Sequence, residues 1–207
     1  MSGEQDHQPL AVEWGSAGAA LEGDESGDVH VVQAFPRGVL VAVIDGLGHG
    51  PEAAAAANEA ARTLEAFAGE PVSALVERCH QALRKTRGAV MTLASFDSWD
   101  SSMTWMGIGN VEGILLRAGP VAQPAREAVT LRGGVVGYQL PTLRASALTV
   151  SRGDTLILAT DGIRGGFLAG LAVRGSPQEL AESIFARYAR GSDDALVVVA
   201  RYLGVTP

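Results

Sequence analysis

Short apolar runs alternate along the chain with turn-forming and helix-forming segments, and they predict most of its secondary structure. The valine-rich runs Val29–Ala34 and Val39–Ile44 are separated by Phe35–Gly38, which contains Pro and Gly. This pattern predicts two antiparallel strands joined as a hairpin. The mixed segments Leu10–Gly15 and Ala17–Gly23 predict an earlier pair of short strands.

Two helices are expected after the hairpin, and a third near the end of the chain. Pro51 opens the Ala-rich stretch Glu52–Ala68, whose composition favours a helix and whose proline suits a first helical turn. The segment Val72–Arg87 has apolar residues at steps of three and four, which marks one buried helix face. Ser176–Arg190 begins with Ser-Pro-Gln-Glu, a helix-capping sequence.

The remaining pattern is that of strands. An antiparallel meander is expected at Val90–Phe96, Met103–Gly107 and Val111–Arg117. Two denser apolar runs predict buried strands at Asp154–Thr160 and Ala195–Tyr202, whereas Ala118–Leu148 has no assignable pattern. Because strands occur in runs and do not alternate strictly with helices, we predict an α+β fold with antiparallel sheets.

Composition narrows the class of protein. With 207 residues, of which 47% are hydrophobic, the chain suits one globular domain over residues 1–207. No apolar run approaches the roughly 20 residues that a membrane span needs, and the polar N-terminus does not resemble a signal peptide, so we expect a cytoplasmic protein. The single cysteine, Cys79, excludes an internal disulfide and a cysteine-cluster metal site.

The net charge of −7 disfavours nucleic acid as a partner, because such binding depends on neutralising phosphates. The same charge would repel any anionic substrate. A bound cation would supply positive charge locally.

Aspartates stand directly at the ends of three predicted buried strands. They are Asp45 before Gly46, Asp161 before Gly162, and the pair Asp193 and Asp194. Since strand ends meet at one rim of a sandwich, carboxylates that are distant in sequence can converge there. Clustered carboxylates repel one another unless a cation neutralises them, and hard divalent cations prefer such oxygen ligands. The pattern predicts a metal site, although Asp-Gly is also a common turn dipeptide.

One longer motif distinguishes between these two interpretations. The string Val-Ile-Asp-Gly-Leu-Gly-His-Gly at 43–50 has three glycines within five residues and leads at once into the Ala-rich helix. Glycines at this density indicate a sharply turning backbone or close approach to a ligand.

These motifs, in this order, resemble the metal-dependent type 2C (PPM) protein serine/threonine phosphatases, in the bacterial branch that includes the stage II sporulation phosphatase. The resemblance is carried by Ser26–Asp28, Asp45–Gly50 with small residues at Ala53–Ala57, Gly107–Val111, Thr160–Gly162 and Asp193–Asp194. The short length, the absence of a sensor domain and the segment Gly133–Tyr138 are most similar to the feedback phosphatases of the bacterial stressosome.

The resemblance implies a central antiparallel β-sandwich flanked by helices, with two divalent cations, Mn²⁺ or Mg²⁺, at one end. By motif position, Asp45 would bridge both metals and the carbonyl of Gly46 would bind one. Asp161 and Asp193 would hold the other metal, and Asp28 would support the site directly or through water. Asp194 is an alternative to Asp193, which we favour as the first residue of the acidic pair.

The implied reaction is hydrolysis of phosphoserine or phosphothreonine by a metal-bridging hydroxide, with catalysis assigned to Asp45, Asp161 and Asp193. The expected partner is a phosphorylated signalling protein, either a stressosome scaffold or an anti-sigma-factor antagonist. Two alternatives are a catalytically silent phosphatase-like binding module for the same partners and a hydrolase of small phosphoesters.

Two further residues have open assignments. His49 lies in the glycine string. It either contacts phosphate or donates a proton, or it has a structural role in which it caps the following helix or packs locally. Asn110 either positions the phosphate or forms a turn with positive φ, a conformation that asparagine tolerates.

Overall fold

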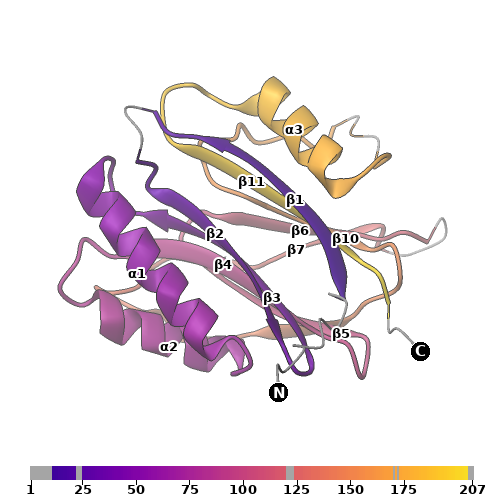
Figure 1. Ribbon diagram of the computed structural model, residues 1–207, viewed down its shortest axis with the longest axis horizontal. Helices are drawn as coiled ribbons and strands as arrows, with labels where there is room; N and C mark the ends of the chain where they lie inside the picture. The colour runs from indigo at the N-terminus through magenta and orange to yellow at the C-terminus, as the bar shows by residue number, and fades with distance from the viewer. Residues whose placement is uncertain (1–10, 22–24, 120–123, 170, 172, 205–207) are drawn as a thin grey trace, which may run out of the picture.

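The computed structural model describes residues 11–21, 25–119, 124–169, 171 and 173–204, which form two facing β-sheets with helices on their outer faces (Figure 1). The first sheet has the order β1 (Val12–Ala19), β11 (Ala195–Tyr202), β10 (Thr155–Ala159), β6 (Glu112–Leu116) and β7 (Arg126–Ala128). The second has the order β2 (Asp28–Phe35), β3 (Gly38–Gly46), β4 (Ala89–Asp97), β5 (Ser102–Ile108) and β8 (Leu131–Arg132), and β9 (Ser146–Thr149) also pairs with β5. Neighbouring strands are antiparallel except β5 and β8. The predicted α+β sandwich is confirmed.

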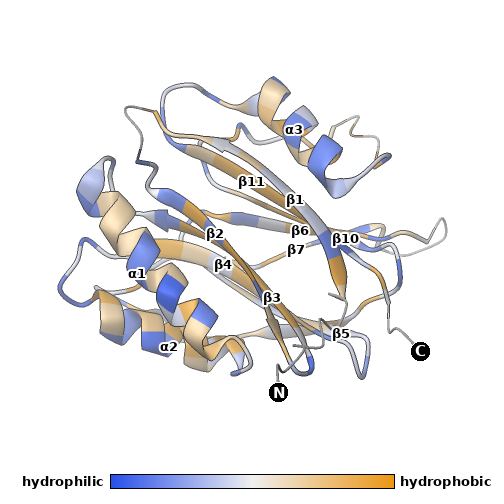
Figure 2. Cartoon of the chain, viewed as in Figure 1, coloured by the Kyte–Doolittle hydropathy of each residue, from blue (hydrophilic) through white to orange (hydrophobic). Residues whose placement is uncertain are grey.

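Strand β3 is apolar without interruption because both of its faces are covered. Val39, Val41 and Val43 pack in the core between the two sheets. The alternating residues Leu40, Ala42 and Ile44 belong to a second core, under the helices. Side chains of a strand point alternately to opposite faces, so a strand buried on both sides needs a continuous apolar run. Figure 2 shows this apolar character along β3, β4 and β11.

Helices α1 (Pro51–Phe67) and α2 (Val72–Leu83) cover the second sheet, and α3 (Pro177–Tyr188) covers the first (Figure 1). The buried face of α1 consists mostly of alanines, so its backbone approaches the sheet closely. The predicted capping box of α3 is present between Ser176 and Glu179. None of the helices in the described part of the chain is long and apolar enough to cross a membrane.

Two predictions near the ends of elements are wrong. The earlier pair of strands is one strand, β1, which continues through Gly15 and Ser16; Leu10 and residues 22–23 lie outside the described residues. Helix α2 ends at Leu83, because the amide and hydroxyl of Thr86 both donate to the Leu83 carbonyl and start a turn.

The predicted meander is also wrong in its third strand. β4 pairs with β5, but β6 lies in the opposite sheet, beside β10. The chain crosses between the sheets at Gly109. This residue has a φ of 89°, which glycine adopts without strain, and a side chain at this position would collide with Val90. After the crossing, the Thr92 hydroxyl donates to the Val111 carbonyl at 2.7 Å. This crossing places Asn110 at the rim of the sandwich, next to the predicted acidic strand ends.

Candidate metal centre

Aspartates from both sheets meet at one rim because the strand register brings their strand ends together. In the second sheet, Asp28 at the start of β2 pairs with Asp45 near the end of β3. In the first sheet, Asp161 follows β10 and Asp193 precedes β11. A side chain on Gly162 would lie 1.9 Å from the Asp194 carbonyl oxygen. The backbone after β10 therefore packs directly against the backbone before β11.

Thr160 connects the two sheets at this rim. Its hydroxyl accepts from the Leu196 amide at 2.9 Å and donates to Asp28 Oδ2 at 2.7 Å. From the sequence alone, Thr160 has no predicted role. The signal in the sequence is a threonine at the end of an apolar run, directly before the candidate ligand Asp161.

The carboxylates of this cluster disfavour one another's ionised forms. Burial, with the charges of Asp28, Asp161, Asp193 and Asp194, raises the pKa of Asp45 to about 8. Burial also raises the pKa of Asp28 to about 7, although the hydrogen bond from Thr160 opposes the shift. Full ionisation of this rim near neutral pH therefore requires compensating positive charge.

Asp193 and Asp194 have different environments. Asp194 is 6% exposed and accepts the amides of Leu21 and Gly27 at 2.7 and 2.6 Å. It thereby holds the segment that enters β2. Asp193 is exposed, and one of its oxygens accepts the Asp194 amide at 2.9 Å. This arrangement favours Asp193 as the residue free to bind a cation and gives Asp194 a structural role.

The glycine string forms the link from β3 to α1. A side chain on Gly46 would lie 2.2 Å from the Ala53 carbonyl oxygen, so only glycine fits under the helix at this position. The Gly46 amide donates to the Gly27 carbonyl at 2.9 Å, which fixes the loop beside Asp28. Gly48 and Gly50 have φ values of 90° and 76°. His49 is exposed in this loop.

Asn110 contacts the acidic cluster directly. Its side-chain amide donates to Asp161 Oδ2 at 2.7 Å. The interpretation of Asn110 as a turn residue with positive φ is wrong, because Gly109 adopts that conformation instead. Asn110 therefore orients a candidate ligand.

The donor set has the chemistry of a hard-cation site. Carboxylates and the Gly46 carbonyl are the oxygen ligands that Mg²⁺ and Mn²⁺ take. As the side chains stand, no group of three His, Cys, Asp or Glu residues within the described ranges is arranged to hold a metal ion. Several of the acids are hydrogen-bonded to protein donors, such as Thr160 and Asn110. Metal binding would exchange some of these hydrogen bonds or proceed through water.

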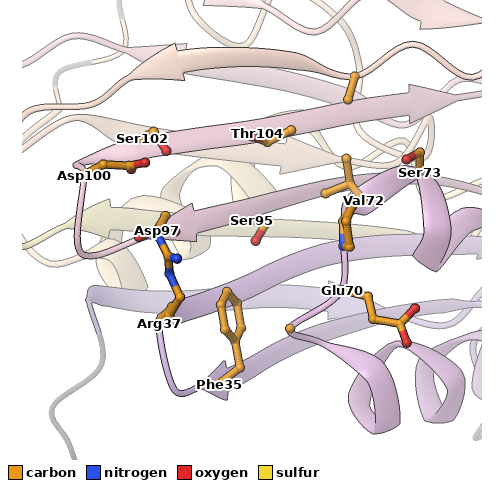
Figure 3. Close-up of a pocket in the computed structure, with 13 residues that line it drawn as sticks. Phe35, Arg37, Glu70, Val72, Ser73, Ser95, Asp97, Asp100, Ser102 and Thr104 are labelled. Carbon is orange, nitrogen blue, oxygen red and sulfur yellow. Dashed lines mark ion pairs between the residues drawn. The ribbon is translucent and has the colours of Figure 1, made fainter.

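An open hollow of about 420 Å³ lies at the opposite end of the second sheet, between α2 and the β2–β3 and β4–β5 turns (Figure 3). Three of the four charged residues that line it are in ion pairs: Arg37 with Asp97, and Glu70 with Arg78; the fourth is Asp100. Its other polar lining includes the hydroxyls of Ser95, Ser102 and Thr104. Two of its three acids, Glu70 and Asp97, are therefore neutralised by arginines, unlike the acids of the opposite rim.

We predict that the metal-free protein loses stability as pH rises. Both raised pKa values exceed the ordinary value of 3.8, so ionisation of Asp28 and Asp45 opposes folding between about pH 4 and pH 8. Asp45→Asn should stabilise the chelator-treated protein at both pH 5 and pH 8, and by at least about 1 kcal/mol more at pH 8, because pH 5 lies only about one unit above the ordinary pKa. Urea unfolding at both pH values measures this difference. The same change in the free energy of unfolding between the two pH values in wild type, Asp45→Asn and the exposed control Asp100→Asn would contradict this prediction.

The two adjacent aspartates should also differ in their effect on stability. Asp194→Ala leaves the buried amide of Gly27 without its acceptor and should lower the free energy of unfolding by about 2 kcal/mol. Asp193→Ala, at an exposed position, should change it by less than about 0.5 kcal/mol. Urea unfolding of both variants in chelator tests this, and equal losses would refute the structural role given to Asp194.

Comparisons with known proteins show the family to which the chain belongs. The family described as stage II sporulation protein E (SpoIIE) matches residues 36–203. Phosphoserine phosphatase RsbX of Bacillus subtilis (strain 168) is 30% identical over 138 residues, which is 66% of this chain and 67% of that protein. The match to RsbX agrees with the predicted similarity to stressosome feedback phosphatases.

Solved structures share the fold over nearly the whole chain. One, described as "The bacterial stressosome: a modular system that has been adapted to control secondary messenger signaling", has a TM-score of 0.83 and 32% identity, over 92% of this chain and 99% of that one. RsbX in complex with magnesium has a TM-score of 0.80 and 24% identity, over 96% and 97%. The PP2C phosphatase domain of SpoIIE from Bacillus subtilis, with a fragment of its regulatory domain, has a TM-score of 0.73 and 24% identity, over 95% and 64%. The predicted family is therefore confirmed: the chain belongs to the SpoIIE family and has the fold of the PP2C phosphatases.

Proposed function

We propose that this chain is a Mn²⁺- or Mg²⁺-dependent phosphatase of phosphoserine and phosphothreonine in proteins. The observation that carries the proposal is the convergence of Asp28, Asp45, Asp161 and Asp193 at one rim, with raised pKa values where burial is greatest. Family membership adds the reaction class, because the relative RsbX is a phosphoserine phosphatase.

The site residues divide into ligands and supports. On this proposal two cations bind: Asp45 would bridge both, the Gly46 carbonyl would bind one, and Asp161 with Asp193 would hold the other. When bound, the cations generate a nucleophile from water at neutral pH and neutralise charge on the phosphoryl oxygens.

Other side chains of the rim act by orienting these ligands. Thr160 fixes one oxygen of Asp28, and Asn110 fixes one oxygen of Asp161. Asp194 holds the segment before β2 through the amide of Gly27. Groups that support ligands in this way restrict their rotation and tune their charge.

A phosphocysteine route through Cys79 is not available. The thiol is buried in α2, within the core under the helices, and burial raises its pKa to about 12. A direct attack by water on the phosphate requires no such nucleophile.

Its relatives indicate the class of substrate. RsbX acts as a phosphoserine phosphatase, and one structure with 32% identity is described with the bacterial stressosome. We therefore propose a phosphorylated stressosome scaffold or anti-sigma-factor antagonist as the partner, in the cytoplasm.

One observation favours a second candidate, a catalytically silent binding module for the same partners. The acids are engaged with protein donors and do not form a ready ligand set within the described residues. If this arrangement persisted in solution, the chain would recognise phosphoproteins without hydrolysing them.

Hydrolysis of a phosphoserine peptide by wild type, Asp45→Asn and Asp100→Asn, each with Mn²⁺ and with chelator, separates these candidates. Phosphate release should require metal, fall at least about 100-fold in Asp45→Asn and persist in the control Asp100→Asn. p-Nitrophenyl phosphate and a nucleotide, run alongside, test the small-phosphoester alternative. Wild type that binds metal and phosphopeptide without turnover would support the silent module.

A further inference from the structure

Arg87 lies against the loop that follows Asp45. It occupies the turn between α2 and β4, and the next residue, Gly88, accepts the Leu47 amide at 3.0 Å. A side chain on Gly48 would lie 2.7 Å from Arg87 Nη1, so the guanidinium occupies space that only a glycine leaves free. Arg87 and Gly88 therefore both contact the loop after Asp45, and the guanidinium lies against Gly48, three residues after that candidate bridging ligand.

The present partner of this guanidinium holds it weakly. Arg87 pairs with Glu52 in the first turn of α1. The two side chains are 49% and 70% exposed. An ion pair this exposed contributes little free energy and is screened by salt, so an incoming anion can replace the glutamate.

Arg87 places a positive charge against the loop that follows Asp45. On the proposed function, the phosphate of a substrate enters beside Asp28, Asp45, Asp161 and Asp193, and the chain has a net charge of −7, so a positive side chain there would offset repulsion of the phosphate. An arginine presents paired N–H donors that match two phosphate oxygens, which a lysine does not.

Resting on the proposed function, we propose that Arg87 binds the phosphoryl group of the substrate, exchanging Glu52 for the phosphate oxygens. Gly48 serves this interaction by leaving space for the guanidinium above the loop. Arg87 is then a substrate-binding residue of the site, and Glu52 is the group that occupies it when no substrate is bound.

Steady-state kinetics with p-nitrophenyl phosphate and saturating Mg²⁺ test this on the full chain. Arg87→Ala should raise KM about 10-fold or more, because it removes charge-assisted hydrogen bonds to phosphate. Arg87→Lys should recover part of the loss. Glu52→Gln should lower KM by about two- to fivefold, because it releases the arginine. Arg84→Ala, on the same exposed segment, is the matched control and should leave KM unchanged.

A readout without turnover separates this inference from the proposed function. Stabilisation of the Mg²⁺-loaded protein by inorganic phosphate should be present in wild type and Arg84→Ala and lost in Arg87→Ala. If wild type shows no turnover but retains this difference, the phosphatase proposal fails and the assignment of Arg87 stands. Equal phosphate binding or equal KM in Arg87→Ala and Arg84→Ala would overturn it. So would a defect confined to the Mg²⁺ activation constant, which would show that Arg87 only supports the loop.

Discussion

Electrostatic repulsion among the carboxylates at one rim is the constraint on which the site depends. Strand register fixes Asp28 beside Asp45, and the corner at Gly162 brings Asp161 to the segment of Asp193. The protein cannot separate these acids without changing the pairing of its strands. Burial and mutual repulsion therefore raise the pKa of two candidate ligands, Asp28 and Asp45, so that full ionisation of the rim would need compensating positive charge.

Hydrogen bonds and packing around the rim hold the mutually repelling carboxylates in place. The Thr160 hydroxyl joins the two sheets through Asp28 and Leu196, and Asp194 anchors the approach to β2 through backbone amides. Alanines on α1 let the helix backbone close over Gly46. The positions of the acids thus depend on core packing, because the elements that bury the apolar strands also determine where the acids lie.

The sequence predicted what depends on local signals. The β2–β3 hairpin, the start of α1 and the acidic strand ends follow from turn residues, alanine content and run length. The sheet to which β6 belongs was predicted wrongly, since strand periodicity does not identify the partner across a crossing at Gly109. The roles of Thr160 and Arg87 depend on contacts between segments far apart or at a turn, which no local pattern encodes.

The central claim is that this rim is a divalent-cation site, and calorimetric titration of Mn²⁺ into the chelator-treated protein tests it most directly. At about pH 7, in buffers of different ionisation enthalpy, binding should release protons, because Asp28 and Asp45 are partly protonated in the metal-free state. Binding should reach two ions per chain and be lost or greatly weakened in Asp45→Asn. Absence of binding, or binding unchanged in Asp45→Asn and without proton release, would contradict the account.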